Sequence, residues 1–418
     1  MDNSSPNLRR IDRVIRGAFY TLALCLPFSI TGAEGALVLL TAALIARAVV
    51  TRRWRPRFGA PEWLLLAFLG WVALAAPLSS RPDLAVARLP RYWIWLTYFV
   101  TAAAIRDRET ARRGTILLML TAGAVAIYGI AQHVFGNAVP RFLMPPVDLW
   151  QKTGGYYHAV GFFDHHLTYG NSLAVILMVG LGAVLAERGR RRLILAAALA
   201  LGLPALLWSY ARSAWVGLLA GLLAFGALLG KRVMALVVIG ALLVGFAAQQ
   251  LSPTLADRLR RSVQSESNLE RIYTWKTTLQ MIRDHPVFGI GSGAYRELAD
   301  EYRRDYNIHW TAKSHAHNSY LQYAAESGVL AGLLFAAFLV ALIALGAARF
   351  YELKDRADTG YRLAAATAGV IGFAAASLLQ HNAGDAEVAM LFQFVAALLI
   401  FYVRDGRDAA SGRDAGTK

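Results

Sequence analysis

Residues 313–348 read KSHAHNSYLQYAAESGVLAGLLFAAFLVALIALGAA. From Gly328 onward this stretch is a long apolar run, and an α-helix needs about 20 such residues to cross the hydrocarbon core of a bilayer. The preceding part places His315, His317 and Asn318 directly beside that run. Polar side chains next to a span are costly in hydrocarbon and are usually kept for a function. The stretch therefore predicts a membrane fold with a functional site at a membrane surface.

The composition of the whole chain favours the same fold class. Of 418 residues, 56% are hydrophobic and 17% are charged, whereas soluble domains are about 25% charged. Apolar runs of spanning length recur, and the alternating pattern of an outer-membrane barrel is not seen. We predict an all-α, polytopic helical membrane protein with about 12 transmembrane helices. The predicted spans cover residues 14–31, 33–50, 62–79, 91–105, 114–136, 166–186, 193–209, 211–229, 232–250, 328–348, 361–380 and 385–403.

The basic residues indicate the orientation of these spans. The formal net charge is +16, and most basic residues form short clusters between alternate apolar runs, which is typical of topology signals rather than of a nucleic-acid surface. Both termini are therefore expected on the cytoplasmic side, and the long hydrophilic segments 137–165 and 251–327 on the outer side. This layout predicts helices 1–9 over residues 1–250, an outer loop domain with interfacial helices over 251–327, and helices 10–12 with a cytoplasmic tail over 328–418.

Cysteine and histidine usage argues against a metal or a disulfide. Cys25, the single cysteine, lies inside the first apolar run, so no internal disulfide or thiolate cluster is available. That run also lacks a small-residue cleavage site, and we interpret it as a retained span. Asp164-His165-His166, with His158, has no recognised metal-ligand spacing and is interpreted as polar lining at the outer mouth of the sixth span. We expect no metal and no cofactor.

Two short helices are expected in the outer loop. Residues 267–284 place Ile272, Trp275 and Leu279 on one helical face, which predicts a helix lying on the outer interface with Arg271 at headgroup height. Residues 316–327 predict a second interfacial helix, capped by Ser314 and ended by Gly328, with His317 on its first turn. The glycine-rich segment 289–293 follows a helix rather than a strand, so we interpret it as a turn whose amides contact an anion.

Several side chains on the outer side are candidates for catalysis or binding. His317 is suited to accept a proton from a hydroxyl near neutral pH, although a histidine in a loop can also serve only to bond the backbone. Arg212, at the outer end of a helix hairpin, and Arg271 are either headgroup anchors or bidentate partners for a phosphate. The same two interpretations apply to Arg88 and Arg91.

Together these motifs resemble a known family. In order, the chain carries Tyr210-Ala211-Arg212-Ser213, Glu270-Arg271-Ile272-Tyr273-Thr274-Trp275, residues 282–291 (IRDHPVFGIG), His315-Ala316-His317-Asn318 and Glu326-Ser327-Gly328. Their order and spacing resemble the O-antigen ligase and polymerase superfamily, the WaaL and Wzy group of bacterial envelope proteins. The likeness is densest over residues 160–335.

The resemblance implies a GT-C-like, metal-independent, inverting glycosyltransferase in the bacterial inner membrane, with its active site facing the periplasm. For a ligase, the implied donor is a glycan on undecaprenyl pyrophosphate and the acceptor is a sugar hydroxyl of lipid A-core oligosaccharide. His317 matches the essential histidine of the family, and Arg212 and Arg271 match its two outer-face arginines. We add Arg88, Arg91, His315, Asn318 and His166 as candidate contacts to the pyrophosphate or sugar. Membrane lipids are expected partners, and nucleic acid is not.

Two other functions remain open at the level of sequence. A polymerase of the same superfamily uses the same donor but a second lipid-linked repeat as acceptor. A secondary transporter or lipid flippase also fits about 12 spans. Against the carrier, the spans hold few charged residues at mid-membrane, and no pair of interrupted helices repeats between the two halves.

Overall fold

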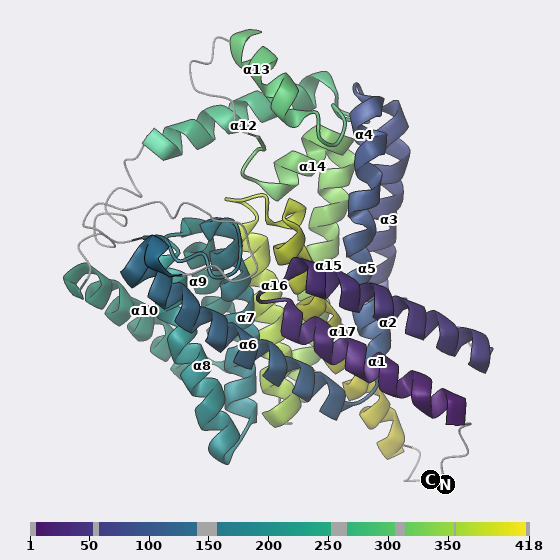
Figure 1. Ribbon diagram of the computed structural model, residues 1–418, viewed down its shortest axis with the longest axis vertical. Helices are drawn as coiled ribbons and strands as arrows, with labels where there is room; N and C mark the ends of the chain where they lie inside the picture. The colour runs from purple at the N-terminus through teal and green to yellow at the C-terminus, as the bar shows by residue number, and fades with distance from the viewer. Residues whose placement is uncertain are drawn as a thin grey trace.

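The computed structural model describes residues 6–52, 58–139, 157–251, 266–305, 314–354 and 357–414. Within these ranges the architecture is helical (Figure 1). The helices are α1 (Pro6–Cys25), α2 (Ile30–Thr51), α3 (Ala60–Ala75), α4 (Pro82–Arg88), α5 (Leu96–Ala104), α6 (Arg108–Phe135), α7 (His166–Ala186), α8 (Gly189–Trp208), α9 (Arg212–Leu229), α10 (Lys231–Leu251), α12 (Glu266–Asp284), α13 (Tyr295–Asp305), α14 (Ser319–Ser327), α15 (Val329–Leu353), α16 (Ala357–Ala376) and α17 (Ala386–Asp414). Short 3-10 helices include η1 (Ala76–Leu78), η2 (Leu89–Trp95) and η4 (Asn382–Gly384).

Among the described residues, 8 helical segments are long and apolar enough to cross a membrane. These are α2, α3 with η1, α6, α7, α8, α9, α15 and the first part of α17. The protein is therefore a polytopic helical membrane protein, as its composition predicted. The remaining predicted spans fall on α1, on η2 with α5, on α10 and on α16, which are not among these segments. Parts of the predicted outer segments, 140–156, 252–265 and 306–313, lie outside the described residues.

Small residues bring α7, α9 and α16 into close contact at the centre of the bundle. A Cβ atom on Gly217 of α9 would lie 2.8 Å from the carbonyl oxygen of Gly372 on α16, and one on Gly221 would lie 2.9 Å from that of Ala368. Helices in membranes pack through such residues because the backbones can then approach closely. This contact holds the start of α9, at Arg212, near the end of α16, beyond which Gln380 follows.

A layer of short helices covers one end of the bundle. In Figure 1, α12 and α13 lie above α14 at the top, and the start of α1 lies at the opposite end. The helix predicted over residues 267–284 is present as α12. The indole Nε1 of Trp275 donates to the Ala316 carbonyl at 3.1 Å. Because of this bond, α12 is fixed against the stretch that contains His315 and His317.

The start of α14 differs from the prediction. The helix begins at Ser319 rather than at Ala316, and Asn318 rather than Ser314 caps it, since the Asn318 Oδ1 accepts from the Tyr320 and Leu321 amides at 2.9 and 3.0 Å. His317 has φ +50° and so cannot belong to the first turn. Gly328, with φ +87°, separates α14 from α15, and a Cβ atom there would overlap the Val287 carbonyl.

Candidate functional site

A cavity of about 590 Å³ opens beneath the layer of short helices. We call it the outer cavity. Its walls come from η2, from the turn that precedes α13, from α14 and from the α16–α17 connection. The lining includes Arg88, Arg91, Arg296, Glu34, Glu326, His315, His381, Tyr92 and Tyr323. Cationic, acidic, imidazole and aromatic groups therefore line one open cavity.

Imidazoles cluster on one wall of the outer cavity. The His315 ring centroid lies 4.2 Å from that of His317 and 6.0 Å from that of His381. Burial, with smaller contributions from the charges of His317, His381 and His165, lowers the pKa of His315 to about 2. Burial and the charge of His317 likewise lower the pKa of His381 to about 3. At neutral pH both rings are therefore uncharged.

His317 is held in a defined orientation and tautomer. Its φ of +50° is uncommon for a residue with a side chain, and its amide donates to His315 Nδ1 at 3.2 Å. Its own Nδ1 lies 2.7 Å from Gln380 Oε1. Because a carbonyl oxygen only accepts, His317 Nδ1 carries the proton and Nε2 keeps a lone pair. The ring is thus arranged to accept a proton at Nε2.

Gln380 is a candidate site residue that was not predicted from the sequence. It lies at the last position of the predicted span 361–380, where it was counted only as part of an apolar run. A signal was present, because Gln380, His381 and Asn382 are three consecutive polar residues at the end of that run. Only the fold brings Gln380 to His317, which is far away in the sequence.

The glycine-rich segment 289–293 is a turn, as predicted, and it packs against α14. Gly289, Gly291 and Gly293 have positive φ, as a tight turn requires. The Ile290 and Gly291 amides donate to the carbonyls of Ala325 and Glu326 at 2.8 and 2.9 Å. These two amides therefore fix the turn against α14, and contact of the turn with a bound anion stays a prediction.

Arg88 and Glu326 both lie close to this turn, at Gly293. The Gly293 amide donates to Glu326 Oε1 at 2.9 Å, and a Cβ atom on Gly293 would lie 2.6 Å from Arg88 Nε. Burial raises the pKa of Glu326, while the Gly293 amide and the Arg88 charge act in the opposite direction. Glycine is therefore needed at position 293 so that Arg88 can lie directly over the turn.

Arg212 lies at the start of α9, next to a second backbone irregularity. Tyr210, two residues earlier, has φ +55°. Ser213 Oγ accepts from Asn171 Nδ2 at 3.1 Å, and Asn171 Oδ1 accepts from Asn382 Nδ2 at 3.2 Å. This chain of bonds joins the first turn of α9 to the residue that follows His381.

Arg271 is carried by α12, in the layer of short helices. It precedes Trp275 by four residues on α12, so the two side chains occupy neighbouring positions on one helical face. Trp275 is bonded to Ala316, directly before His317. The elements that carry Arg212, Arg271 and His317 are thus joined to one another around the end of α16.

Of the eight predicted site residues, Arg88, Arg91 and His315 line the outer cavity. Asn318 caps α14 and is nearly buried. His166 lies beneath the Arg212 hairpin, where its Nδ1 donates to the Ser209 carbonyl at 2.7 Å and its ring packs against His158. Within the described ranges, no group of three or more His, Cys, Asp or Glu side chains is arranged to hold a metal ion.

Comparison with known proteins gives one family. No curated protein matches the chain. The family model described as O-antigen ligase matches residues 196–336, a range that includes Arg212, Arg271 and His317 but neither Arg88 nor Gln380. Over residues 196–336 the chain is thus similar to the O-antigen ligase family, the resemblance that its motifs predicted.

Proposed function

We propose that this protein is an O-antigen ligase that transfers a glycan from undecaprenyl pyrophosphate to a sugar hydroxyl of lipid A-core oligosaccharide. In this proposal about 12 helices cross the bacterial inner membrane, both termini are cytoplasmic and the outer cavity faces the periplasm. The observation that carries the proposal is the His317 ring, oriented by the bond between its Nδ1 and Gln380, beside a cavity whose wall bears arginines.

The proposed step is a single displacement at the anomeric carbon. The acceptor hydroxyl gives its proton to His317 Nε2 while its oxygen forms a bond to the anomeric carbon. The bond from that carbon to the pyrophosphate oxygen breaks, and its electron pair leaves with undecaprenyl pyrophosphate. Attack from the opposite face inverts the configuration. General-base assistance of this kind is worth about 10²–10⁴-fold in rate.

His317 is a better candidate for the base than His315. A base works best when its pKa lies near the working pH, and burial lowers the pKa of His315 to about 2. The Nδ1 of His315 also accepts the His317 amide proton. We assign His315 the role of holding the unusual backbone of His317, and of lining the cavity with its remaining edge.

Guanidinium groups are proposed to stabilise the leaving pyrophosphate, without a metal. Arginine matches phosphate oxygens in a bidentate way, and fixed donors aimed at developing charge are a major source of rate acceleration. We assign this role to Arg212 and Arg271. The charge of Arg88 lowers the pKa of the nearby, partly buried Glu326, so we assign Arg88, with Arg91, to binding of the sugar or the donor headgroup.

Reconstitution tests the proposal. Purified protein in detergent receives a glycan on undecaprenyl pyrophosphate and rough lipopolysaccharide, with chelator present and no ion gradient. We expect glycan attached to the lipid A-core. Longer lipid-linked chains without any attachment would instead identify a polymerase, and translocation without transfer would identify a carrier.

A further inference from the structure

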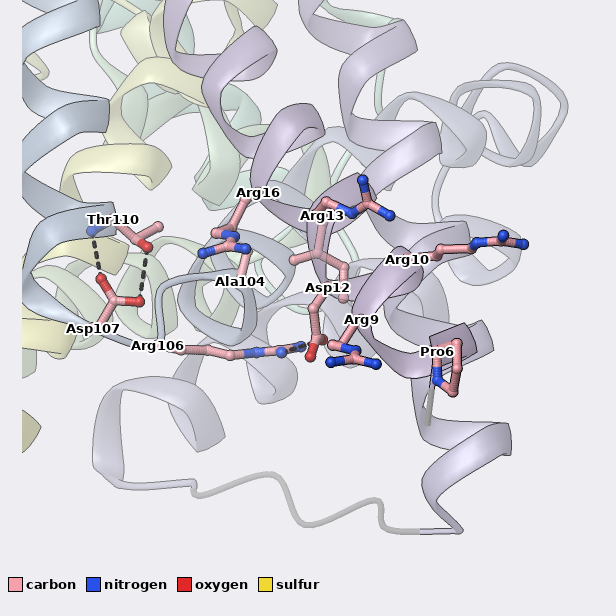
Figure 2. A pocket seen from close by; sticks show the side chains of 11 residues that line it. Pro6, Arg9, Arg10, Asp12, Arg13, Arg16, Ala104, Arg106, Asp107 and Thr110 are labelled. Atoms are coloured by element: carbon pink, nitrogen blue, oxygen red, sulfur yellow. Dashed lines mark hydrogen bonds and ion pairs between the residues drawn. The ribbon is translucent and has the colours of Figure 1, made fainter. Parts of the chain in front are cut away.

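A second cavity, of about 680 Å³, lies at the other end of the bundle (Figure 2). We call it the basic cavity. It is formed by the first half of α1 and by the connection between α5 and α6. Its charged lining residues are Arg9, Arg10, Arg13, Arg16, Arg106, Asp12 and Asp107. Arginine thus outnumbers the acidic residues on its wall.

Both aspartates of the basic cavity are already engaged. Asp12 accepts from Arg47 Nε at 3.0 Å and also pairs with Arg106. Asp107 caps α6, since its carboxylate accepts from the Thr110 amide at 2.7 Å and from the Thr110 hydroxyl at 3.0 Å, as Figure 2 shows. Neither carboxylate therefore neutralises the arginines of α1.

The arginines of α1 lie on an exposed side of the helix, and its apolar side is buried in the bundle. Arg9, Arg13 and Arg16 are exposed and spaced so that they share one side of the helix. None of the ion pairs recorded between described residues involves them or Arg10. The opposite side of α1, with Ile15 and Phe19, is buried in the bundle. Four cations therefore remain available at the mouth of the cavity.

The basic cavity and the outer cavity lie at opposite ends of the same helices. Glu34, near the start of α2, lines the outer cavity, whereas Arg47, near its end, bonds Asp12. Trp95, just before α5, lines the outer cavity, and Ala104, at the end of α5, lines the basic one. The basic cavity therefore belongs to the membrane surface away from the proposed chemistry.

We propose that the basic cavity binds the phosphate headgroup of an anionic phospholipid. Arginine forks match phosphate oxygens, and basic clusters at the ends of spanning helices attract anionic lipid. The two helices that meet near the cavity, α1 and α2, also expose large hydrophobic residues, Val14 on α1 and Val49 and Val50 on α2. An acyl chain can pack against such exposed apolar side chains, whereas a soluble phosphate cannot, and this difference selects the lipid.

Native mass spectrometry of the delipidated full-length protein tests this proposal. The protein is titrated separately with phosphatidylglycerol, phosphatidylcholine and inorganic phosphate. The test variant carries Arg9→Gln, Arg13→Gln and Arg16→Gln. The matched control carries Arg190→Gln, Arg191→Gln and Arg192→Gln, which alter an equally exposed arginine cluster on α8 that does not line the cavity.

We expect the test variant to bind phosphatidylglycerol at least about tenfold more weakly than the parent protein, with the control variant unchanged. Phosphatidylcholine should bind all three proteins equally. Equal weakening in both variants would show a general effect of charge and overturn the proposal. Inorganic phosphate that displaces phosphatidylglycerol at equal concentration would overturn the lipid assignment. Monodisperse elution and unchanged melting of the test variant would exclude misfolding as the cause.

Discussion

The outer and basic cavities are similar in volume, and both are rich in arginine, yet their surroundings differ. In the outer cavity, arginines share the wall with two imidazoles and two partly buried glutamates. In the basic cavity, exposed arginines surround two aspartates that are already bonded, and its described lining residues include no histidine. Arginine binds anions in either setting. Proton transfer from a hydroxyl also needs a proton acceptor in a fixed orientation. In our proposal that acceptor is His317, which lies beside the outer cavity.

Removing the proton acceptor should produce the largest effect. His317→Ala is expected to lower the rate of glycan transfer by about 10²–10⁴-fold, because general-base assistance is lost while donor binding remains. The measurement is single-turnover transfer by the purified variant. His285→Ala is the matched control, since this histidine in the same outer layer bonds Ser80 instead. A His317→Ala protein with normal turnover would contradict the assignment.

The proposed pyrophosphate contacts should come next. Arg212→Ala and Arg271→Ala are each expected to lower transfer by about 10²–10³-fold, as losses of transition-state donors do. Lysine at either position should restore only part of the rate, because it cannot form a bidentate contact. Arg283→Ala, an exposed arginine on the same α12, serves as the control. Equal losses in all three alanine variants would show a general effect of charge and would contradict specific roles for Arg212 and Arg271.

Changing the partner of His317 should have a smaller effect. Gln380→Leu is expected to lower kcat by about 10–100-fold, as loss of a partner that orients a functional histidine does. Gln380→Glu keeps an acceptor oxygen and should recover most of the rate. Its negative charge should also raise the pKa of His317, so the acid limb of the pH–rate profile should move to higher pH. An unshifted profile would show that Gln380 only fills space.

The smallest expected effect is on stability as a function of pH. Burial lowers the pKa of His315 to about 2 and that of His381 to about 3, whereas an unfolded histidine titrates near about 6.5. The unfolded chain therefore binds more protons below about pH 6.5, and the folded state should lose stability as the pH falls through that value. Thermal unfolding in detergent from pH 8 to pH 5 measures this loss. His315→Asn should flatten the curve, and a midpoint that rises with acid would contradict it.

Local patterns predicted the helical elements well, because apolar periodicity and run length are properties of neighbouring residues. The long runs became helices, and residues 267–284 became α12. The start of α14 was predicted wrongly, because Asn318 and Ser314 are both good caps and sequence does not show which amides each one meets. Because His317 has φ +50°, it cannot belong to a helix, and the helix therefore begins after Asn318, which caps it.

Contacts between distant segments could not be predicted in this way. The bond from His317 to Gln380 and the close approach of Arg88 to Gly293 depend on how α14, α16 and η2 pack. The arginines of α1 were interpreted only as a topology signal. Their gathering around a cavity requires the α5–α6 connection, which lies some distance further along the chain.

The most direct test of the central claim locates the donor on the parent protein. A glycan on undecaprenyl pyrophosphate, with a photoreactive group beside the diphosphate, is bound, crosslinked and mapped by peptide mass spectrometry. Adducts should fall on the walls of the outer cavity, on residues 88–95 or 292–296, or on the adjoining segments at residues 212–215, 271–275 and 315–323. Adducts confined to the basic cavity, on residues 6–16 or 104–110, would contradict the account.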